Sequence, residues 1–512
     1  MNLSLRRRIL PTLARVLAPA FAVLLLGLAG CNSVVGSGNA PRRIVIVSPS
    51  ATTPLVTLAM YQCLTSAVRA LLYFDDGSVG DFTRRATWSS SNTGAVEVSN
   101  DDVVIPGTGG FYAAGTLIPR GPGKSVVTAN YFGIATQMVV SVGTPQNIHL
   151  TYLDDGLYRP LYQVNLDQTS PRDFFTMGSG STVQLAVLAT LDGIETDISA
   201  FADFHFREPN DGVATITASG NGAGVISALS QGGPLVPVAS FSPCGLDNIS
   251  DPNGIVSMSV QPITQINMRA ELSNNPNQAV SASNPLVPLI AGNAEKFIVE
   301  ADLANGDKQD VHSQSTLTTS NSSFAIFGAS GSNNILTSTA PGGPLVISAD
   351  FKGINFELQS GSYSTSVQQR QLSTISVCWS DALDYTYNIY DDKTCLDPTD
   401  PAYVAPASNP SVGGGSLQPL QFHAMGNYGT NDAGTGYLYQ DVTRTSVWSS
   451  SNAGAATIRT NPLNAGQASA ASLGPSSTTI TTTNSTATNL STVQNQLQVL
   501  PANLASENDP LP

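Results

Sequence analysis

One phrase occurs twice in this chain, and it constrains the fold more than any other feature of the sequence. DFTRRATWSSSNTGAVEV spans residues 81–98, and DVTRTSVWSSSNAGAATI spans residues 441–458. The two 18-residue segments are identical at 10 positions, including the whole run WSSSN. Because internal self-similarity is the mark of repeated units, the phrase predicts an array of related modules.

The same spacing identifies two further copies between these segments. Each copy has an Asp that follows a Gly-containing turn. These anchors are Asp81, Asp197, Asp310 and Asp441, at intervals of 116, 113 and 131 residues. In the third copy Leu317 follows its anchor by seven residues, in the register of Trp448. In the second copy we assign the equivalent place to Phe206, which requires a two-residue insertion. The chain therefore contains about four modules.

Short alternating segments separated by Gly and Pro turns fill each module. PGKSVVTANYFG (122–133) and PGGPLVISADFKG (341–353) are examples. This alternation is the period of a half-buried strand, and Asp-Gly or Asn-Gly pairs supply hairpin turns. Many short strands at regular spacing predict an all-β chain of β-sandwiches.

Boundaries between the modules fall where one alternating strand leads through a short polar break into the next. We place these seams near Gly143, Ile263 and Gln369. The predicted segments are a leader at 1–30, a linker at 31–40, modules at 41–143, 144–263, 264–369 and 370–500, and a disordered tail at 501–512. Because the breaks are short, we expect the modules to form an extended, semi-rigid array.

The succession of DGS, DVT, WSSSN, a Val-rich strand and a Gly-Pro-Gly turn resembles the bacterial immunoglobulin-like domains of group 2. This resemblance implies tandem immunoglobulin-like sandwiches of the kind found in bacterial surface and envelope proteins. Copies one and four match the motif closely, copy three keeps its spacing, and copy two departs from it. Such modules share no common active site, so the resemblance implies a fold rather than an activity.

Four residues in equivalent register are interpreted as structural core. They are Trp88, Phe206, Leu317 and Trp448. Sandwiches bury a large side chain on an inner strand, and the following Ser89 to Asn92 would form a polar turn. The rival interpretation is an aromatic that stacks on a sugar. Leu317 argues against it, because Leu fits a core and does not stack comparably.

The N-terminus predicts secretion and a lipid anchor. Arg6 to Arg8 precede an apolar core at residues 16–28, which is the pattern of a signal peptide. The apolar run is shorter than the ~20 residues that a membrane span requires. The closing LAGC resembles the lipobox of bacterial lipoproteins, which implies cleavage before Cys31 and acylation of its sulfur. Asn32 in place of Asp then implies the outer membrane, with the side that the protein occupies left open.

The low content of charged residues and the excess of acidic ones limit the partners that the chain can bind. Charged residues make up 11 % of the chain, against about 25 % in ordinary soluble domains. Without the four arginines of the leader, 18 basic residues face 36 acidic ones. A chain this acidic, without basic clusters, is a poor ligand for nucleic acid or for anionic lipid surfaces.

Four cysteines remain beside Cys31, which allow three disulfide pairings. We predict a bond between Cys378 and Cys395 that fixes a loop projecting from the fourth module. In the chain-entropy model, closing such a loop stabilises the fold by roughly 3 kcal/mol. Cys63 and Cys244 would then join neighbouring modules, or both would remain buried thiols. The sequence leaves these two alternatives open.

Motifs for catalysis are missing from the sequence. The four histidines are far apart, and there is no HExxH, no G-x-S-x-G and no P-loop. We therefore expect no enzyme and no cofactor.

Two acidic loops, 247–254 and 390–400, contain oxygen ligands of the type that Ca²⁺ prefers, but neither has the EF-hand register. The weak calcium candidates are Asp247, Asp251, Asp391 and Asp397. Solvated loops are the favoured interpretation, and Tyr385, Tyr387 and Tyr390 are either a contact surface or one face of a strand.

These observations support two functions from different classes. The first is a non-catalytic, lipid-anchored envelope protein whose modules serve adhesion, surface presentation or envelope assembly. Its partners would be the membrane, through Cys31, and an envelope protein. The alternative is a glycan-binding surface module, with or without calcium. An enzyme would require distant residues to converge on one site.

Overall fold

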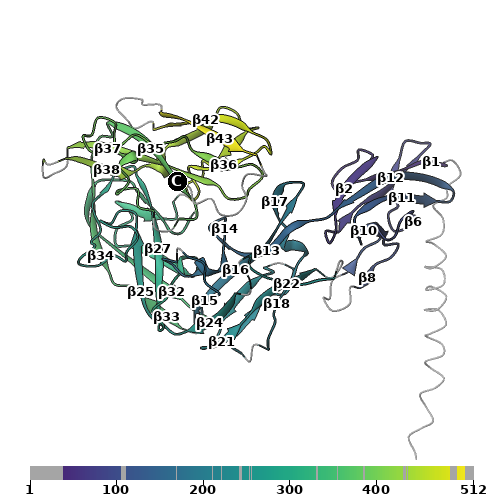
Figure 1. Ribbon diagram of the computed structural model, residues 1–512, viewed down its shortest axis with the longest axis horizontal. Coiled ribbons are helices and arrows are strands. Elements are labelled where there is room, and N and C mark those ends of the chain that lie inside the picture. The colour runs from purple at the N-terminus through teal and green to yellow at the C-terminus, as the bar shows by residue number, and fades with distance from the viewer. Residues whose placement is uncertain are drawn as a thin grey trace, which may run out of the picture. The chain divides into compact units, whose positions relative to one another are not determined.

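The computed structural model describes residues 39–501, except 105–110, 169, 210–211, 221, 242–244, 253, 255, 330–331, 355, 385–386, 431–433, 435 and 485–492. The chain divides into two compact units, Met1–Gly143 and Thr144–Pro512 (Figure 1). The predicted leader, Cys31, Cys244 and the tail from residue 502 lie outside the described residues. No helix within the described ranges is long and apolar enough to cross a membrane.

The first unit is a β-sandwich. Its strands are β1 (Pro41–Val47), β2 (Thr57–Tyr61), β3 (Ser66–Ala67), β4 (Arg69–Phe74), β5 (Val79–Asp81), β6 (Thr87–Ser90), β7 (Val96–Val98), β8 (Val103–Val104), β9 (Phe111–Tyr112), β10 (Thr116–Pro119), β11 (Gly123–Tyr131) and β12 (Ile134–Gly143). The larger sheets have the orders β2-β12-β11-β6, β1-β4-β5 and β3-β10-β7. Trp88, Leu72 and Leu117 belong to one core cluster between them.

The second unit contains three more modules. Module two contains β13 (Gln146–Asp154), β14 (Leu157–Arg159), η1 (Leu161–Val164), β15 (Phe174–Gly178), β16 (Thr182–Leu191), β17 (Ile194–Asp197), η2 (Ser199–Phe201), β18 (Asp203–Phe206), β19 (Ala214–Ile216), β20 (Val225–Ala228), β21 (Gly232–Leu235), β22 (Pro237–Phe241), β23 (Leu246–Ile249) and β24 (Ser257–Gln261). Module three contains β25 (Ile263–Ala270), β26 (Leu289–Ile290), β27 (Ala294–Leu303), β28 (Lys308–Asp310), η4 (His312–Gln314), β29 (Ser315–Thr319), β30 (Ala325–Phe327), β31 (Ile335–Ser338), β32 (Gly342–Lys352), β33 (Glu357–Gln359) and β34 (Tyr363–Gln368). Module four contains β35 (Thr374–Asp381), η5 (Lys393–Cys395), β36 (Ser411–Gly413), β37 (Leu420–Thr430), β38 (Tyr437–Asp441), η6 (Thr443–Thr445), β39 (Val447–Ser450), β40 (Ala456–Ile458), β41 (Gln467–Ala470), β42 (Ser476–Thr483) and β43 (Val493–Leu500).

All four modules are immunoglobulin-like β-sandwiches with a shared pairing pattern, which confirms the predicted fold class. Modules three and four have equivalent sheets, β25-β27-β31-β30 with β26-β34-β32-β29, and β35-β37-β41-β40 with β36-β43-β42-β39. In every module an early strand pairs in parallel with the last one. These pairs are β2 with β12, β15 with β24, β26 with β34, and β36 with β43. Each sheet draws its strands from one of the four predicted segments, except that β25 begins at Ile263, the last residue of the second segment.

The Asp anchors occupy the same structural position in each module. Each anchor is the last residue of a strand, β5, β17, β28 or β38. Its carboxylate Oδ1 accepts the backbone N–H two residues later, for example from Thr83 to Asp81 at 2.9 Å and from Thr443 to Asp441 at 2.8 Å. An Asp that bonds its own backbone in this way ends a strand with a defined turn. The anchors therefore mark turns.

The repeated WSSSN phrase builds the same contacts in modules one and four. Trp88 and Trp448 are each 3 % exposed, and their indole Nε1 atoms donate to the carbonyls of Thr83 and Thr443 at 2.9 and 3.0 Å. The third residue of WSSSN also makes the same contact in both modules. Ser90 and Ser450 each donate a hydrogen bond to the backbone carbonyl of the residue six positions later. Only the turn prediction needs adjustment: Ser89 and Ser90 still belong to β6, and the bend begins at Ser91. The phrase therefore recurs because the fold recurs.

The second module keeps the common spacing, and the assignment of Phe206 to the core position is wrong. Phe204 is fully buried, whereas Phe206 at the end of β18 is half-buried. Phe204 follows Asp197 by seven residues, as Leu317 follows Asp310. The error came from an insertion that the chain does not contain. Residues two apart share one face of a strand, so both rings point to the same side of β18; Phe206 is the last residue of the strand and is less covered than Phe204.

The second unit is compact, and the expected extended array is wrong for its three modules. Modules two and four are not adjacent in sequence, yet they touch. The N–H of Glu195 donates to the carbonyl of Gly415 at 2.6 Å, and the N–H of Leu417 donates to the Glu195 carboxylate at 2.9 Å. Gln418 donates to the carbonyl of Tyr158 at 2.8 Å. Hairpins of module two thus reach the long loop that precedes β37, which the short seams alone did not reveal.

Candidate functional site

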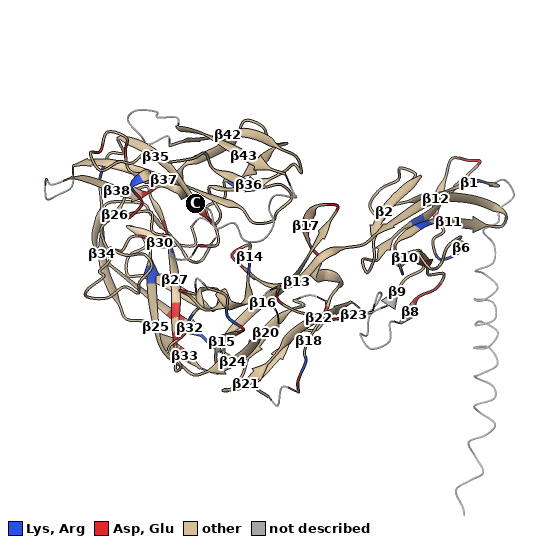
Figure 2. Cartoon of the chain, viewed as in Figure 1, with Lys and Arg blue, Asp and Glu red and all other residues tan. Residues whose placement is uncertain are grey.

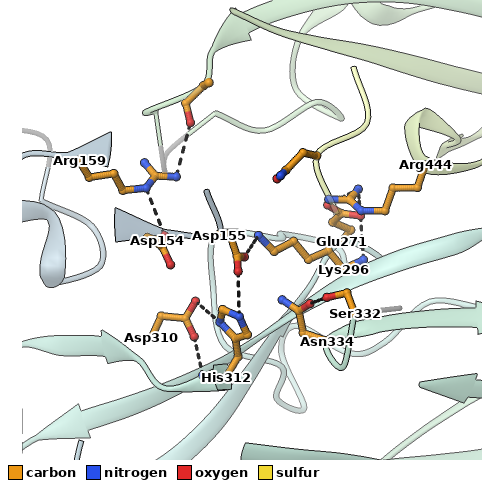
Figure 3. A network of polar contacts seen from close by, with 12 residues as sticks. Asp154, Asp155, Arg159, Glu271, Lys296, Asp310, His312, Ser332, Asn334 and Arg444 are labelled. Atoms are coloured by element: carbon orange, nitrogen blue, oxygen red, sulfur yellow. Dashed lines mark hydrogen bonds and ion pairs between the residues drawn. The ribbon is translucent and has the colours of Figure 1, made fainter. Parts of the chain in front are cut away.

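A charged junction lies where modules two, three and four meet (Figure 3). Module two contributes the tight hairpin between β13 and β14. At its tip Asp155 has φ +47° and is followed by Gly156, the Asp-Gly turn that the sequence indicates. The Asp155 carboxylate lies 2.7 Å from the Lys296 amine and 3.1 Å from His312 Nε2, both in module three. The hairpin therefore joins module two to module three through two cationic partners.

His312 is held between two carboxylates. Its Nδ1 lies 2.9 Å from Asp310, and its Nε2 faces Asp155. Burial alone would lower the pKa of His312, but Asp310 and Asp155 together raise it to about 11. Burial would likewise raise the pKa of Asp155, yet Lys296 and His312 hold it far below its ordinary value. Since His312 stays protonated at neutral pH with both nitrogens occupied, it has no lone pair with which to act as a general base.

The other half of the junction joins modules three and four. Arg444, which follows the module-four anchor, lies 2.9 Å from the Glu271 carboxylate. Glu271 also accepts the backbone N–H of Lys296 at 3.0 Å. In Figure 3 Glu271 and Arg444 lie side by side next to Lys296, so the two halves form one continuous network.

Glu295 lies in this network as a buried acid. It is fully buried, and no hydrogen-bond donor among the described residues reaches its carboxylate oxygens, while the Glu271 carboxylate lies within hydrogen-bonding reach. Burial raises its pKa well above the ordinary value, and the neighbouring Glu271 and Asp441 raise it further. An uncompensated charge in such a place is costly, so burial favours the neutral form of Glu295.

A third contact closes the junction between modules two and four. Arg159 at the end of β14 pairs with Asp154 at 3.2 Å. The same guanidinium donates to the backbone carbonyl of Leu383 in module four, also at 3.2 Å. The hairpin thus contacts both other modules. Of these residues only the anchor Asp310 is singled out by the sequence pattern, because Asp155 lies 141 and 157 positions from its partners Lys296 and His312.

The Cys378–Cys395 disulfide is present and ties the loop after β35 to its own sheet, with 4.9 Å between the two Cα atoms. The predicted projection of this loop is wrong. Both cysteines and Ile389 are buried in a small cluster with Met425, and Tyr387 and Tyr390 pack against it. These tyrosines are neither an exposed surface nor one face of a strand, because the loop packs against β37. Tyr385 lies outside the described residues.

The other candidate residues are not brought together. Asp247 is exposed on β23, and the buried Asp251 accepts the backbone N–H of Leu161 at 3.0 Å. Asp391 accepts from the amide of Asn388. Burial would raise the pKa of Asp397, but hydrogen bonds from Thr374 and Thr399 lower it, so donors already occupy its oxygens. Only one group of three potential metal ligands converges within the described ranges, and two of its members are the disulfide sulfurs.

Cys63 is disulfide-bonded. Its predicted partner, Cys244, lies outside the described residues, so that pairing stays a prediction.

Two cavities border the interfaces within the second unit. One of about 210 Å³ lies beside the junction and is lined by Asp154, Asp155, Asp310 and His312. The other, of about 280 Å³, lies between modules three and four. Its walls include Tyr390, Tyr439, Asn274, Gln368, Gln440 and Arg370.

No protein-family model and no curated protein matches the chain. Among solved structures it is similar to domains 5–6 of the S-layer protein SbsC, with 16 % identity, a TM-score of 0.18, and coverage of 44 % of this chain and 100 % of that chain. It is also similar to the insect immune protein hemolin, with 10 % identity, a TM-score of 0.17, and coverage of 90 % and 100 %. The four N-terminal Ig domains of Dscam1 isoform 6.9 have 8 % identity, a TM-score of 0.20 and the same coverage. Likenesses at such scores carry no argument about function, and the fold assignment rests on the sheets themselves.

Proposed function

We propose that the protein is a non-catalytic, lipid-anchored component of a bacterial cell envelope, built from group 2 immunoglobulin-like modules. It presents a compact three-module body for adhesion, surface presentation or envelope assembly. The observation that carries this proposal is the charged junction, because its titratable groups are engaged in holding modules together.

The electrostatics of the junction support a structural role. Asp155 and Asp310 together neutralise Lys296 and the protonated His312, and the side chains of these four residues are at most 23 % exposed. Buried ion pairs add little net stability, but they disfavour arrangements that would leave one member unpaired. The junction therefore selects one relative placement of modules two to four. A surface protein benefits from such a fixed body, since loops held rigidly lose less entropy on binding.

The anchor is tested on the N-terminal peptide of the native protein. Mass spectrometry of the membrane fraction is expected to find Cys31 as the first residue, carrying acyl chains. Changing Cys31 to Ser is expected to abolish this modification. An unmodified Cys31, or a mature N-terminus at another residue, would contradict the lipid-anchor proposal. Separation of inner and outer membranes then tests the location that Asn32 implies.

A second candidate function, glycan binding, is favoured by the cavity between modules three and four. Its tyrosines offer rings, and its amides and guanidinium offer hydrogen-bond donors, the combination with which proteins bind sugar hydroxyls. Glycan arrays with and without a chelator test this candidate. Binding that is lost in Asn274→Ala, an exposed member of the wall, would support it. Absence of binding in both conditions would remove it.

A further inference from the structure

The hairpin between β11 and β12 of the first module exposes a large aromatic side chain at its tip. Phe132 is 88 % exposed, the highest value among the exposed large hydrophobic side chains. Its backbone is left-handed, with φ +49°, and Gly133 follows at φ +86°. Non-glycine residues are uncommon in this conformation, and Asn or Asp tolerates it better than Phe. Neither core packing nor turn geometry therefore accounts for a Phe at this position.

Phe132 is the outermost member of a row of aromatic rings. Its ring lies 4.7 Å from Tyr131, which lies 4.8 Å from Phe82. Phe82 lies 5.9 Å from Phe74, and the guanidinium of Arg85 lies over its ring at 5.4 Å. The other rings of the row pack against one another beneath the hairpin tip and hold the Phe132 side chain in place, while the Phe132 ring itself faces solvent.

The chain enters the first module at this same end. Pro41, the first residue of β1, is paired with Phe74 across the sheet. The N–H of Asp75 donates to the carbonyl of Ala40 at 3.1 Å. The segment from Cys31 to Asn39 has eight peptide links, which reach at most about 30 Å when fully extended. If Cys31 is acylated, as the proposed function holds, the aromatic end of the module stays close to the bilayer.

Charge does not oppose such a contact. Residues 39–143 contain seven basic and six acidic side chains, whereas residues 144–512 contain eleven basic and 30 acidic ones. The acidity of the whole chain, which argued against lipid surfaces, therefore belongs to the second unit. At the aromatic end Arg84 pairs with Asp102 at 3.1 Å, and Asp76 accepts from Asn39 at 2.5 Å. Figure 2 shows charges of both signs on the first module.

We infer that the β11–β12 hairpin tip, led by Phe132, is a lipid-contact surface that enters the boundary between headgroups and acyl chains. Aromatic side chains favour this boundary, and burial of apolar area drives such binding. The inference rests on the proposed lipid anchor for its geometry. A bilayer fits better than a protein groove, because the tether brings this end of the module to the membrane.

Tryptophan fluorescence of the mature chain on vesicles tests this inference. The chain is coupled through the Cys31 thiol to a maleimide lipid in vesicles of phosphatidylethanolamine and phosphatidylglycerol, so the result does not depend on natural acylation. Phe132→Trp is compared with Lys124→Trp, an exposed residue at the opposite end of β11. Lipids brominated near the headgroup are expected to quench Phe132→Trp and shift its emission to the blue. They are expected to leave Lys124→Trp unchanged.

Two outcomes would overturn the inference. Equal quenching of both variants would mean that the hairpin has no preferred contact. A Phe132→Trp emission that stays unquenched and open to aqueous quenchers would assign the tip to a protein partner or to solvent. Either outcome leaves the lipid-anchor proposal standing, because that proposal is tested separately on the native N-terminus.

Discussion

At the scale of single residues, the distance from the Asp anchor decides which side chain enters the core. Trp88, Leu317 and Trp448 are 3, 6 and 3 % exposed. Phe204 completes the series at the same distance of seven residues. The type of side chain varies among the four modules while its position does not, as expected for a packing role.

The corrected register predicts unequal effects of two neighbouring substitutions. Phe204→Ala is expected to lower the free energy of unfolding by about 3–5 kcal/mol, because it empties a fully buried site. Phe206→Ala removes a half-buried ring and is expected to cost about 1 kcal/mol. Urea denaturation of the two variants measures both values. A larger effect at Phe206 would support the two-residue insertion in module two and contradict the assignment of Phe204 to the core position.

Glu295 makes stability depend on pH in a defined direction. Its folded pKa is raised above the ordinary 4.5, so the unfolded chain loses this proton first as the pH rises. Unfolding is therefore favoured progressively above about pH 4.5. Glu295→Gln keeps the shape of the side chain and cannot ionise. We therefore expect the free energy of unfolding of this variant at about pH 8 to exceed that of the wild type by ~1 kcal/mol or more.

The same two proteins should have nearly equal stability near about pH 4, where the wild-type acid is protonated in both states. Denaturation curves across this range provide the measurement, with Glu357→Gln on the exposed β33 as the matched control. A gain for Glu295→Gln that is constant with pH would show that ionisation is not its cause.

At the scale of elements, the β13–β14 hairpin does more than connect two strands. Its Asp-Gly turn is a local signal, but the tip contacts module three through Asp155, and the end of β14 contacts module four through Arg159. A turn that exposes two carboxylates would be ordinary on a single sandwich. Here neighbouring modules cover most of both carboxylates, which are 18 and 15 % exposed.

Removing the hairpin carboxylate should loosen the second unit. Asp155→Ala leaves Lys296 and His312 buried without their shared partner, and we expect a loss of about 3–5 kcal/mol. Glu357→Ala breaks an exposed pair with Lys352, and surface pairs of this kind contribute about 0–1 kcal/mol. Thermal unfolding compares the two. An Asp155→Ala variant as stable as the Glu357→Ala control would contradict the structural role of the junction.

At the scale of the whole molecule, the four modules divide into a first unit of one sandwich and a second unit of three. The second unit is held by contacts between all three pairs of its modules. Arg444 with Glu271, Lys296 with Asp155, and Leu417 with Glu195 are examples. Such mutual contacts predict that modules two to four unfold together.

The repeated phrase provides a matched pair of variants for this prediction. Trp88→Ala and Trp448→Ala make the same change in the same phrase, and each is expected to cost about 3–5 kcal/mol. Trp448→Ala should lower a calorimetric transition shared by modules two, three and four, and Trp88→Ala should lower only that of the first module. Hydrogen exchange assigns the transitions. Loss of protection confined to module four in Trp448→Ala would refute shared unfolding.

Local structure in this protein could be predicted from short-range sequence patterns. Strand period, Asp-Gly turns and anchor spacing depend on neighbouring residues, and they were sufficient to predict the four sandwiches, Trp88 and Trp448 in the core, and the Cys378–Cys395 bond. The Phe206 error also arose locally, from an insertion assumed to align a less similar copy.

The packing of the modules in the second unit depends on contacts between residues far apart in the sequence. Asp155 and His312 are 157 residues apart, and no pattern in either segment specifies the other. An Asp in a turn has the same local conformation whether its carboxylate faces water or a buried cation. The sequence around the turn therefore does not predict which of the two the carboxylate faces. The charged junction, the buried Glu295 and the packed disulfide loop follow from which surfaces meet, and that depends on the burial of whole faces rather than on neighbours along the chain.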